Sequence, residues 1–131
     1  MEVTVKYIDN QKFIAQAGSH QLVIDQAKEK GGNDEGMNPL ETFLVSLAAC
    51  AGVYAKSYCQ SAGIDTKDLT ISVTSELSLD PPKRFKDIQV KISLGQDIGD
   101  REKALLNFVK NCPVHNTLAG KPEVNFSLQT P

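Results

Sequence analysis

Apolar and polar residues alternate along three short segments at the start of the chain. Residues 3–8, 12–16 and 21–25 are rich in β-branched and aromatic side chains, and such runs favour strands. Two turn-forming tripeptides, Asp-Asn-Gln and Gly-Ser-His, separate them. The pattern predicts a three-stranded meander. Residues 28–36 then lose all apolar periodicity and are dominated by glycine and charge, which predicts a loop.

The next element is a long helix with well-marked ends. Asn38 can cap it, Pro39 suits the first helical position, and Glu41 falls at the third. We expect the helix to run to about Ala62, since Gly63 supplies a stop. Apolar residues recur every three or four positions but also fill much of the remaining circumference, so we expect burial nearly all round. The recurring set is Leu40, Phe43, Leu44, Leu47, Cys50, Ala51 and Tyr54.

Alternation with period two returns in the second half of the chain. Residues 69–78 and 88–94 follow this pattern and predict two more strands. A second helix is expected from Asp100, as its cap, to Asn111. A short helical turn should follow at 114–119.

The last alternating segment, residues 124–128, predicts a final strand. The element order is then βββαββαβ. Antiparallel strands segregated from the helices make the fold class α+β. The length of 131 residues fits a single domain, 1–131, that is large enough for a core without disulfide or metal staples.

Composition narrows the possible partners. A net charge of -2 with scattered lysines gives no footprint for nucleic acid. Glu41 and Lys56 interrupt the longest apolar run, so no membrane span is expected. The start of the chain does not look like a signal peptide, and the cysteine count is odd. We therefore expect a cytoplasmic protein with reduced thiols and a small-molecule ligand.

Two of the three cysteines stand in unusual places. Cys50 lies deep in the apolar helix, and Cys112 opens the segment Cys-Pro-Val-His-Asn at a helix break. Free cysteine often packs as a small hydrophobe, but these positions suggest a pair brought together by the fold for thiol redox chemistry. Cys59 is half a turn out of phase with Cys50 and about 13 Å further along the helix axis. We interpret Cys59 as a packed thiol.

Three segments resemble the OsmC/Ohr family of osmotically inducible and organic hydroperoxide resistance proteins. They are Asn-Pro-Leu-Glu at 38–41, Leu-Val-Ser-Leu-Ala-Ala-Cys at 44–50, and Cys-Pro-Val-His-Asn at 112–116. The resemblance spans nearly the whole chain and includes the strand order. It implies an OsmC-like fold in an intertwined homodimer, with the long helices at its centre and two sites at the subunit interface.

The resemblance also implies roles for individual residues. Cys50 corresponds to the peroxidatic cysteine, Cys112 to the resolving cysteine, and Glu41 to the glutamate of the family's site. Glu41 is nine residues from Cys50, so the two side chains point in opposite directions on one helix. If Glu41 serves Cys50, we expect it to come from the partner subunit. The apolar circumference of the helix independently asks for a second copy.

A thiolate is the nucleophile in such chemistry, and apolar surroundings oppose its formation unless a cation lies nearby. The family's peroxidases use an arginine near the start of the second strand. The matching stretch here offers Lys12, which has charge but lacks the planar fork that can hold a carboxylate and a sulfur together. Arg84, in a proline-containing loop, is an alternative cation. The substitution of lysine counts against efficient peroxidase activity.

The implied cycle needs no cofactor. Cys50 would attack an organic hydroperoxide and become a sulfenic acid, and Cys112 would condense with it to a disulfide. A dithiol donor, for example a lipoylated protein, would reduce that disulfide. Phe43, Leu47 and Tyr54 are candidates for an apolar substrate wall.

His115 is a further candidate for substrate binding, or it could orient Cys112 or cap the short turn. A metal site built from Cys50, Glu41 and His115 lacks the four protein ligands of structural zinc, so no metal is expected. Two functions remain open. One is a thiol-dependent peroxidase in oxidative or osmotic stress defence. The other is a non-catalytic relative that binds an apolar or thiol-reactive small molecule at the dimer interface.

Overall fold

A computed structural model describes all residues, 1–131. Two compact units make up the chain, residues 1–45 and residues 46–131, and each is described by itself. The element order is three strands, a long helix, two strands and two short helices, with two 3-10 turns between them. This arrangement confirms the α+β class and the antiparallel sheets.

The first unit contains the predicted meander. Strands β1 (Thr4–Asp9), β2 (Lys12–Ala17) and β3 (His20–Ile24) pair antiparallel in the order β1-β2-β3. Tyr7 on β1 faces Phe13 on β2, and their rings meet edge to face at 5.5 Å. One face of this sheet carries an open apolar groove of about 440 Å³. The groove is lined by Val3, Val5, Phe13, Ala15, Ile24, Pro39 and Thr42.

A buried carboxylate organises the loop after β3. Asp25 is 1% exposed, and it accepts backbone hydrogen bonds from Gln26 at 2.8 Å and from Asn33 and Glu35 at 3.1 Å each. Burial alone would raise the pKa of Asp25, but these N–H donors and the charge of Lys12 outweigh it and hold the pKa below its usual value. The loop is therefore folded around a charge.

Two glycines in this loop allow the close approach that Asp25 requires. A Cβ on Gly32 would lie 1.8 Å from the carbonyl oxygen of Gln26, and one on Gly36 would lie 2.3 Å from that of Val23. No other residue fits without moving the backbone. The glycine-rich composition thus gives an ordered turn, which includes the 3-10 helix Lys28–Lys30.

Helix α1 (Pro39–Ser61) matches the predicted long helix. Its buried residues, Leu47, Ala51, Ala55 and Cys59, are spaced by four and form one stripe. The expectation of burial nearly all round is therefore wrong for a single chain. Val53, for example, is 65% exposed, because the elements of one chain cover only one face of the helix.

Helix α1 is also more apolar than the sequence analysis assumed when it predicted no membrane span. Despite Glu41 and Lys56, an 18-residue window of the helix has mean hydropathy 1.2, so it could cross a membrane by length and composition alone. Core helices of globular proteins meet the same criterion.

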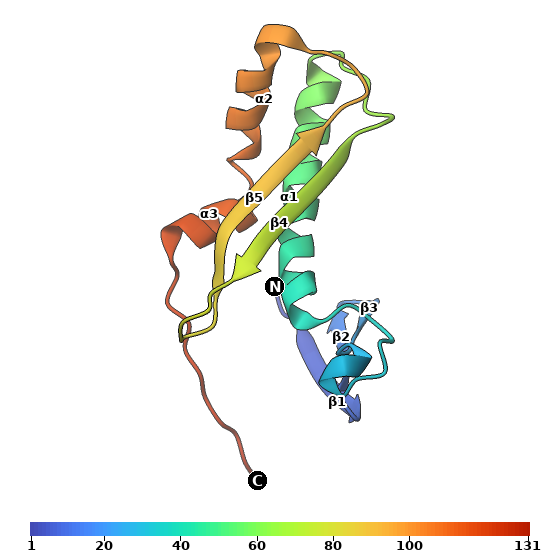
Figure 1. The fold of residues 1–131 in the computed structure, drawn as a ribbon, viewed down its shortest axis with the longest axis vertical. Helices are drawn as coiled ribbons and strands as arrows, with labels where there is room; N and C mark the ends of the chain where they lie inside the picture. Colours follow the sequence, from blue (N-terminus) through green and yellow to red (C-terminus); the bar gives the residue numbers. More distant parts are fainter. The chain divides into compact units, whose positions relative to one another are not determined.

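The second unit contains a hairpin and two short helices beside the later part of α1 (Figure 1). Strands β4 (Thr70–Leu77) and β5 (Phe85–Ser93) pair antiparallel, and α2 (Glu102–Val109) and α3 (Pro113–Gly120) follow. Their apolar faces enclose one core, which includes Ala51, Ala55, Cys59, Ile64, Ile98, Leu105 and Val109. The core ties α1 to the elements that carry Cys112.

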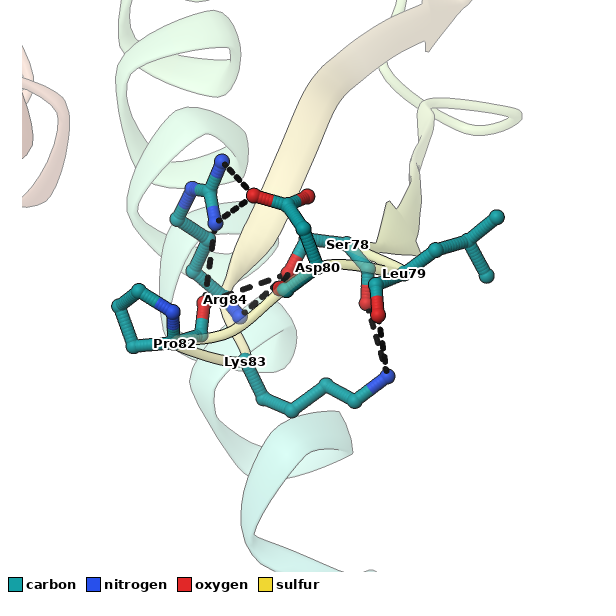
Figure 2. Close-up of polar contacts among 6 residues, drawn as sticks. All are labelled: Ser78, Leu79, Asp80, Pro82, Lys83 and Arg84. Carbon is teal, nitrogen blue, oxygen red and sulfur yellow. Dashed lines mark hydrogen bonds and ion pairs between the residues drawn. The ribbon is translucent and has the colours of Figure 1, made fainter.

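The loop between β4 and β5 is tied together by its own polar groups (Figure 2). The buried Ser78 hydroxyl donates to the Asp80 carbonyl at 2.9 Å and accepts from the Arg84 backbone N–H at 3.2 Å. The Lys83 ammonium donates to the Ser78 carbonyl at 3.0 Å. The Arg84 guanidinium pairs with Asp80 at 3.3 Å. The Arg84 guanidinium, considered above as an alternative activating cation, is therefore paired with a carboxylate of its own loop.

Two predicted details of the C-terminal half are wrong. Asp100 does not cap the second helix. It lies inside the 3-10 turn Gly99–Arg101, where Asp97 accepts from the Gly99 N–H at 2.7 Å instead. The segment 124–128 forms no strand, and Phe126 is 94% exposed. Alternation alone cannot make a strand, because a strand needs a neighbouring edge to pair with.

Candidate active site

The two cysteines predicted to pair lie within hydrogen-bond reach of each other. Cys50 comes from the middle of α1, and Cys112 lies between α2 and α3 in the same unit. Their side chains are close enough for Cys50 to influence the pKa of Cys112, and both are free thiols. Cys50 is half-buried, whereas Cys112 is 1% exposed. The fold therefore places two free thiols from distant parts of the sequence beside each other.

Cys112 is the N-cap of α3. Its sulfur accepts the backbone N–H of His115 at 3.4 Å, and Pro113 follows in the first helical position. Burial raises the pKa of the Cys112 thiol, and the hydrogen bond with Cys50 raises it further, while the N–H groups of His115 and Val114 partly offset both effects. Cys112 therefore remains a protonated thiol near neutral pH.

His115 connects the two short helices. Its ring Nδ1 lies 2.8 Å from the carbonyl oxygen of Lys110, which follows the last residue of α2. That carbonyl has no partner within the helix, as is usual for a helix end. The imidazole is thereby held beside the Cys112 segment. The sequence-based suggestion that His115 caps the short turn is wrong for its side chain, since it bonds to the preceding helix.

A pocket of about 240 Å³ opens on this arrangement within the second unit. Its walls are mainly apolar and come from α1, β5 and α2, with three polar or reactive side chains among them. The lining is Leu47, Ala51, Ile88, Val90, Ile92, Leu106, Val109, Lys110, Cys112 and His115. Leu47 and His115, both predicted to bind substrate, line it. Cys50 does not.

Two other predicted wall residues lie outside this pocket. Tyr54 packs against Phe108, with ring centroids 5.7 Å apart. Phe43, near the start of α1, is 38% exposed. Lys110 is a pocket residue that sequence reasoning missed. The sequence did show that Lys110 lies two residues before Cys112, at the end of the second helix, and this position could have indicated that it lies near the site.

Glu41 and Lys12 have other partners in the first unit. The Glu41 carboxylate accepts the Asn38 backbone N–H at 2.8 Å, and the Asn38 side chain accepts the Glu41 N–H at 2.9 Å, which is a capping box. Lys12 pairs with Glu35 at 2.8 Å and Asp9 at 3.6 Å. The hydrogen bond with Glu35 raises the pKa of Lys12 against the effect of desolvation. Both charged side chains therefore stabilise local structure within the first unit.

Two remaining sequence-based interpretations can be compared with the geometry. Cys59 is fully buried in the core, as expected for a packed thiol. Burial raises the pKa of Cys59, and the charge of Arg101 offsets this only in part. No group of three or more His, Cys, Asp or Glu side chains that could hold a metal ion occurs in the chain. Cys50, Glu41 and His115 thus do not form such a group.

Comparisons with known proteins agree with this fold. The family model described as OsmC-like protein matches residues 31–127. The chain is 27% identical over 125 residues to a protein of Mycoplasma genitalium named hydroperoxide reductase, covering 91% of this chain and 86% of that one. It is 26% identical over 102 residues to Protein YhfA of Escherichia coli K12, covering 76% and 73%.

Among solved structures, an OsmC-like protein from Mycoplasma pneumoniae superimposes with a TM-score of 0.75. It is 26% identical, and the match covers 91% of this chain and 86% of that one. The arrangement of elements is therefore shared across nearly the full length of both proteins.

Proposed function

The chain belongs to the OsmC-like protein family, and from this premise we propose that it is a thiol peroxidase that reduces organic hydroperoxides in stress defence. The observation that carries the proposal is that the Cys50 and Cys112 side chains, sixty-two positions apart in the sequence, are neighbours in the second unit. The relative named hydroperoxide reductase supports the same class of reaction.

In the proposed reaction, Cys50 is the attacking residue. Its thiolate attacks the distal oxygen of the hydroperoxide, the O–O bond breaks, and the alkoxide takes up a proton and leaves as an alcohol. Cys50 is then a sulfenic acid. The Cys112 sulfur attacks the Cys50 sulfur and displaces water, which leaves a disulfide. Because Cys112 is buried and protonated at rest, it serves better as the resolving thiol than as the first nucleophile.

Intact-mass measurement after one equivalent of cumene hydroperoxide tests this proposal. The parent protein should lose two hydrogens, and peptide mapping should place the disulfide between Cys50 and Cys112. A Cys112→Ser variant should instead gain oxygen at Cys50, and a Cys50→Ser variant should no longer consume peroxide. Cys59→Ala is the matched control and should behave like the parent. A Cys50→Ser variant that clears peroxide at the parent rate would exclude the mechanism and favour a ligand-binding role.

We also propose that the working form is a homodimer built around α1. Along the uncovered side of this helix, Val45, Ala49 and Val53 are spaced by four and are exposed, Val53 by 65%. An exposed apolar stripe of this kind marks an interaction surface. Sedimentation at micromolar concentration should show a dimer, and a folded monomer would refute this part of the proposal. The sequence-based prediction that Glu41 and Lys12 belong to the site refers to that assembly, and the Glu41→Gln variant described in the Discussion tests it for Glu41.

A further inference from the structure

Helix α3 is weakly anchored to the rest of the second unit. It has eight residues, Pro113–Gly120, and none of them is buried. Val114 is half-buried, and all the other residues of the helix are exposed. Isolated helices shorter than about 12–15 residues are marginal in water, and most helices in proteins depend on the packing of an apolar face. Packing contributes little to α3, so polar contacts at its N-terminal end carry much of its stability.

Three side-chain contacts hold that end, and each involves one of the residues 110–112. The Cys112 sulfur caps the helix by accepting the His115 backbone N–H at 3.4 Å. The His115 ring is bonded to the Lys110 carbonyl at 2.8 Å, and the Asn116 side chain donates to the Asn111 carbonyl at 3.1 Å. The cap differs from the other two contacts, because its acceptor is a sulfur that can also form a covalent bond.

A cap and a disulfide place different demands on the Cys112 sulfur. Cys50 and Cys112 are neighbouring free thiols. In a disulfide the two sulfurs lie about 2.05 Å apart with a Cβ–S–S–Cβ dihedral of about 90°. Two unbonded sulfurs are kept further apart by van der Waals repulsion, so they approach each other by roughly 1 Å when the bond forms. Cys112 keeps its place against the His115 N–H only if Cys50 makes the whole movement.

Cys50 is the partner that moves less easily. It directly precedes Ala51, which is 2% exposed and belongs to the core of the second unit. A shift of Cys50 would displace α1 against that core, and close packing resists such a displacement. Cys112 is itself buried, but it lies between the core residue Val109 and the unburied α3. We therefore expect the movement to fall on the Cys112 side, where the chain that follows is free to adjust.

We propose that Cys112 is a redox-sensitive helix cap. When it bonds to Cys50, its sulfur leaves the His115 N–H, α3 loses its cap, and residues 113–131 loosen. The segment after α3 forms no helix or strand and is exposed throughout (Figure 1), so it does not hold α3 in place. The oxidation state of a largely buried pair thus becomes detectable at the protein surface. This inference goes beyond the proposed function and shares with it only the Cys50–Cys112 disulfide.

A two-electron oxidant starts the change. The two thiols lose two electrons and two protons as the S–S bond forms. Diamide takes up both when its N=N double bond becomes a single bond with one hydrogen on each nitrogen. A hydroperoxide takes them up when its O–O bond breaks to give an alcohol and water. A dithiol reduces the disulfide by exchange, and the cap should then be restored.

Hydrogen exchange followed by mass spectrometry tests the proposal. The disulfide is made with diamide, so that the test does not depend on peroxide activity, and peptide mapping verifies it. Loss of an N-cap lowers the equilibrium constant for forming a helix by roughly twofold to thirtyfold. We expect the α3 amides to exchange at least twofold faster in the oxidised protein, while the α2 amides keep their rates. Unchanged exchange in α3 after the disulfide has formed would overturn the inference.

Variants of Cys112 separate the effect of the cap from that of the disulfide. Cys112→Ala removes the cap acceptor without forming a disulfide, so its α3 should exchange as fast as that of the oxidised parent. Cys112→Ser keeps a preferred cap acceptor and forms no disulfide, so its α3 should stay protected with or without diamide. Unchanged exchange in α2 shows that each variant is folded. Cys59→Ala is the matched control and should respond to diamide like the parent.

Slow exchange of α3 in Cys112→Ala would show that the cap does not hold this helix, and would refute the inference. Fast exchange of α3 in reduced Cys112→Ser would do the same, because that variant still has a cap.

Limited proteolysis gives a second readout at the start of α3. The bond between Lys110 and Asn111 lies between α2 and α3, and its carbonyl is held by the His115 ring. Trypsin should cut this bond at least twofold faster in the oxidised protein, with fragments counted after reduction. The bond after Lys103, inside α2, is the control and should be cut equally fast in both forms. Faster cutting at both bonds would indicate general destabilisation and contradict a change confined to α3.

The outcomes distinguish this inference from the peroxidase proposal. If hydroperoxide forms the disulfide and α3 stays protected, only the inference fails. If diamide forms the disulfide and hydroperoxide does not, only the peroxidase proposal fails. If neither reagent joins Cys50 to Cys112, both fail.

Discussion

Glu41 offers a sharp test of whether a residue predicted to be catalytic has a structural role instead. In the structure, its carboxylate accepts the Asn38 N–H at 2.8 Å at the start of α1. Glu41→Ala removes this hydrogen bond and the favourable negative charge at the helix N-terminus. Glu41→Gln keeps an acceptor in the capping box and removes only the charge.

The expected losses differ between the two variants. A lost cap hydrogen bond costs about 1 kcal/mol, and a lost charge at a helix N-terminus costs about 0.3–1 kcal/mol. At about 2.1 cal/mol/K per residue, the 131 residues have an unfolding entropy of about 275 cal/mol/K. Glu41→Ala should therefore lower the Tm by about 5–7 °C and Glu41→Gln by about 1–4 °C.

Thermal unfolding followed by circular dichroism at fixed protein concentration checks the stability, and peroxide consumption checks the activity. If Glu41 acts only as a cap, Glu41→Gln retains the parent rate of peroxide consumption. A Glu41→Gln variant with a nearly unchanged Tm and at least a hundredfold lower rate would refute that reasoning and give Glu41 a catalytic charge. Asn38→Ala is the matched control, since it breaks the same box without touching the carboxylate.

Three further predictions concern the rest of the fold. The pKa of Asp25 is lowered in the folded protein, so its contribution to stability is full above the unfolded pKa of about 4 and is lost as the pH falls through the folded value. The Asn33 and Glu35 amides should therefore be the first to lose protection from hydrogen exchange, relative to their intrinsic rates, as the pH falls, and a uniform loss of protection across the chain would contradict this. Val53→Glu should dissociate the proposed dimer while leaving each chain folded, as sedimentation and circular dichroism would show, and an intact dimer would place the interface elsewhere. Leu105→Ala should cost about 2–5 kcal/mol in chemical denaturation because the side chain is 3% exposed in the core, and a loss under 1 kcal/mol would mean that this core is not formed.

Most helices and strands were predicted correctly, because caps, stops and turns depend on residues that are adjacent in the sequence. The cap at Asn38 and the stop at Gly63 located α1 to within a residue or two, and turn-forming tripeptides located the first three strands. The segment 124–128 shows the limit of such signals. Its alternation is that of a strand, but the segment pairs with no edge of either sheet, and a strand forms only where such pairing occurs.

The site was predictable only in part, for a related reason. The positions of Cys50 and Cys112 indicated a pair, and the structure brings them together. The spacing from Asn38 to Glu41 supported two interpretations at once, a capping box and a catalytic glutamate, and a sequence pattern does not say where a carboxylate finds its partner. The hydrogen bond between the His115 ring and the Lys110 carbonyl joins α2 to α3 across a helix break. Hydrophobic periodicity within either helix does not predict a contact of that kind.

The buried thiol of Cys59 can report on how often the core of the second unit opens. With 0% of its surface exposed, this thiol can meet a reagent only when α1 separates from the core around it. Its modification rate in the native state therefore measures how often that core opens. Labelling the native protein with a thiol reagent over time would therefore report the opening of this core through a residue that the chain already contains.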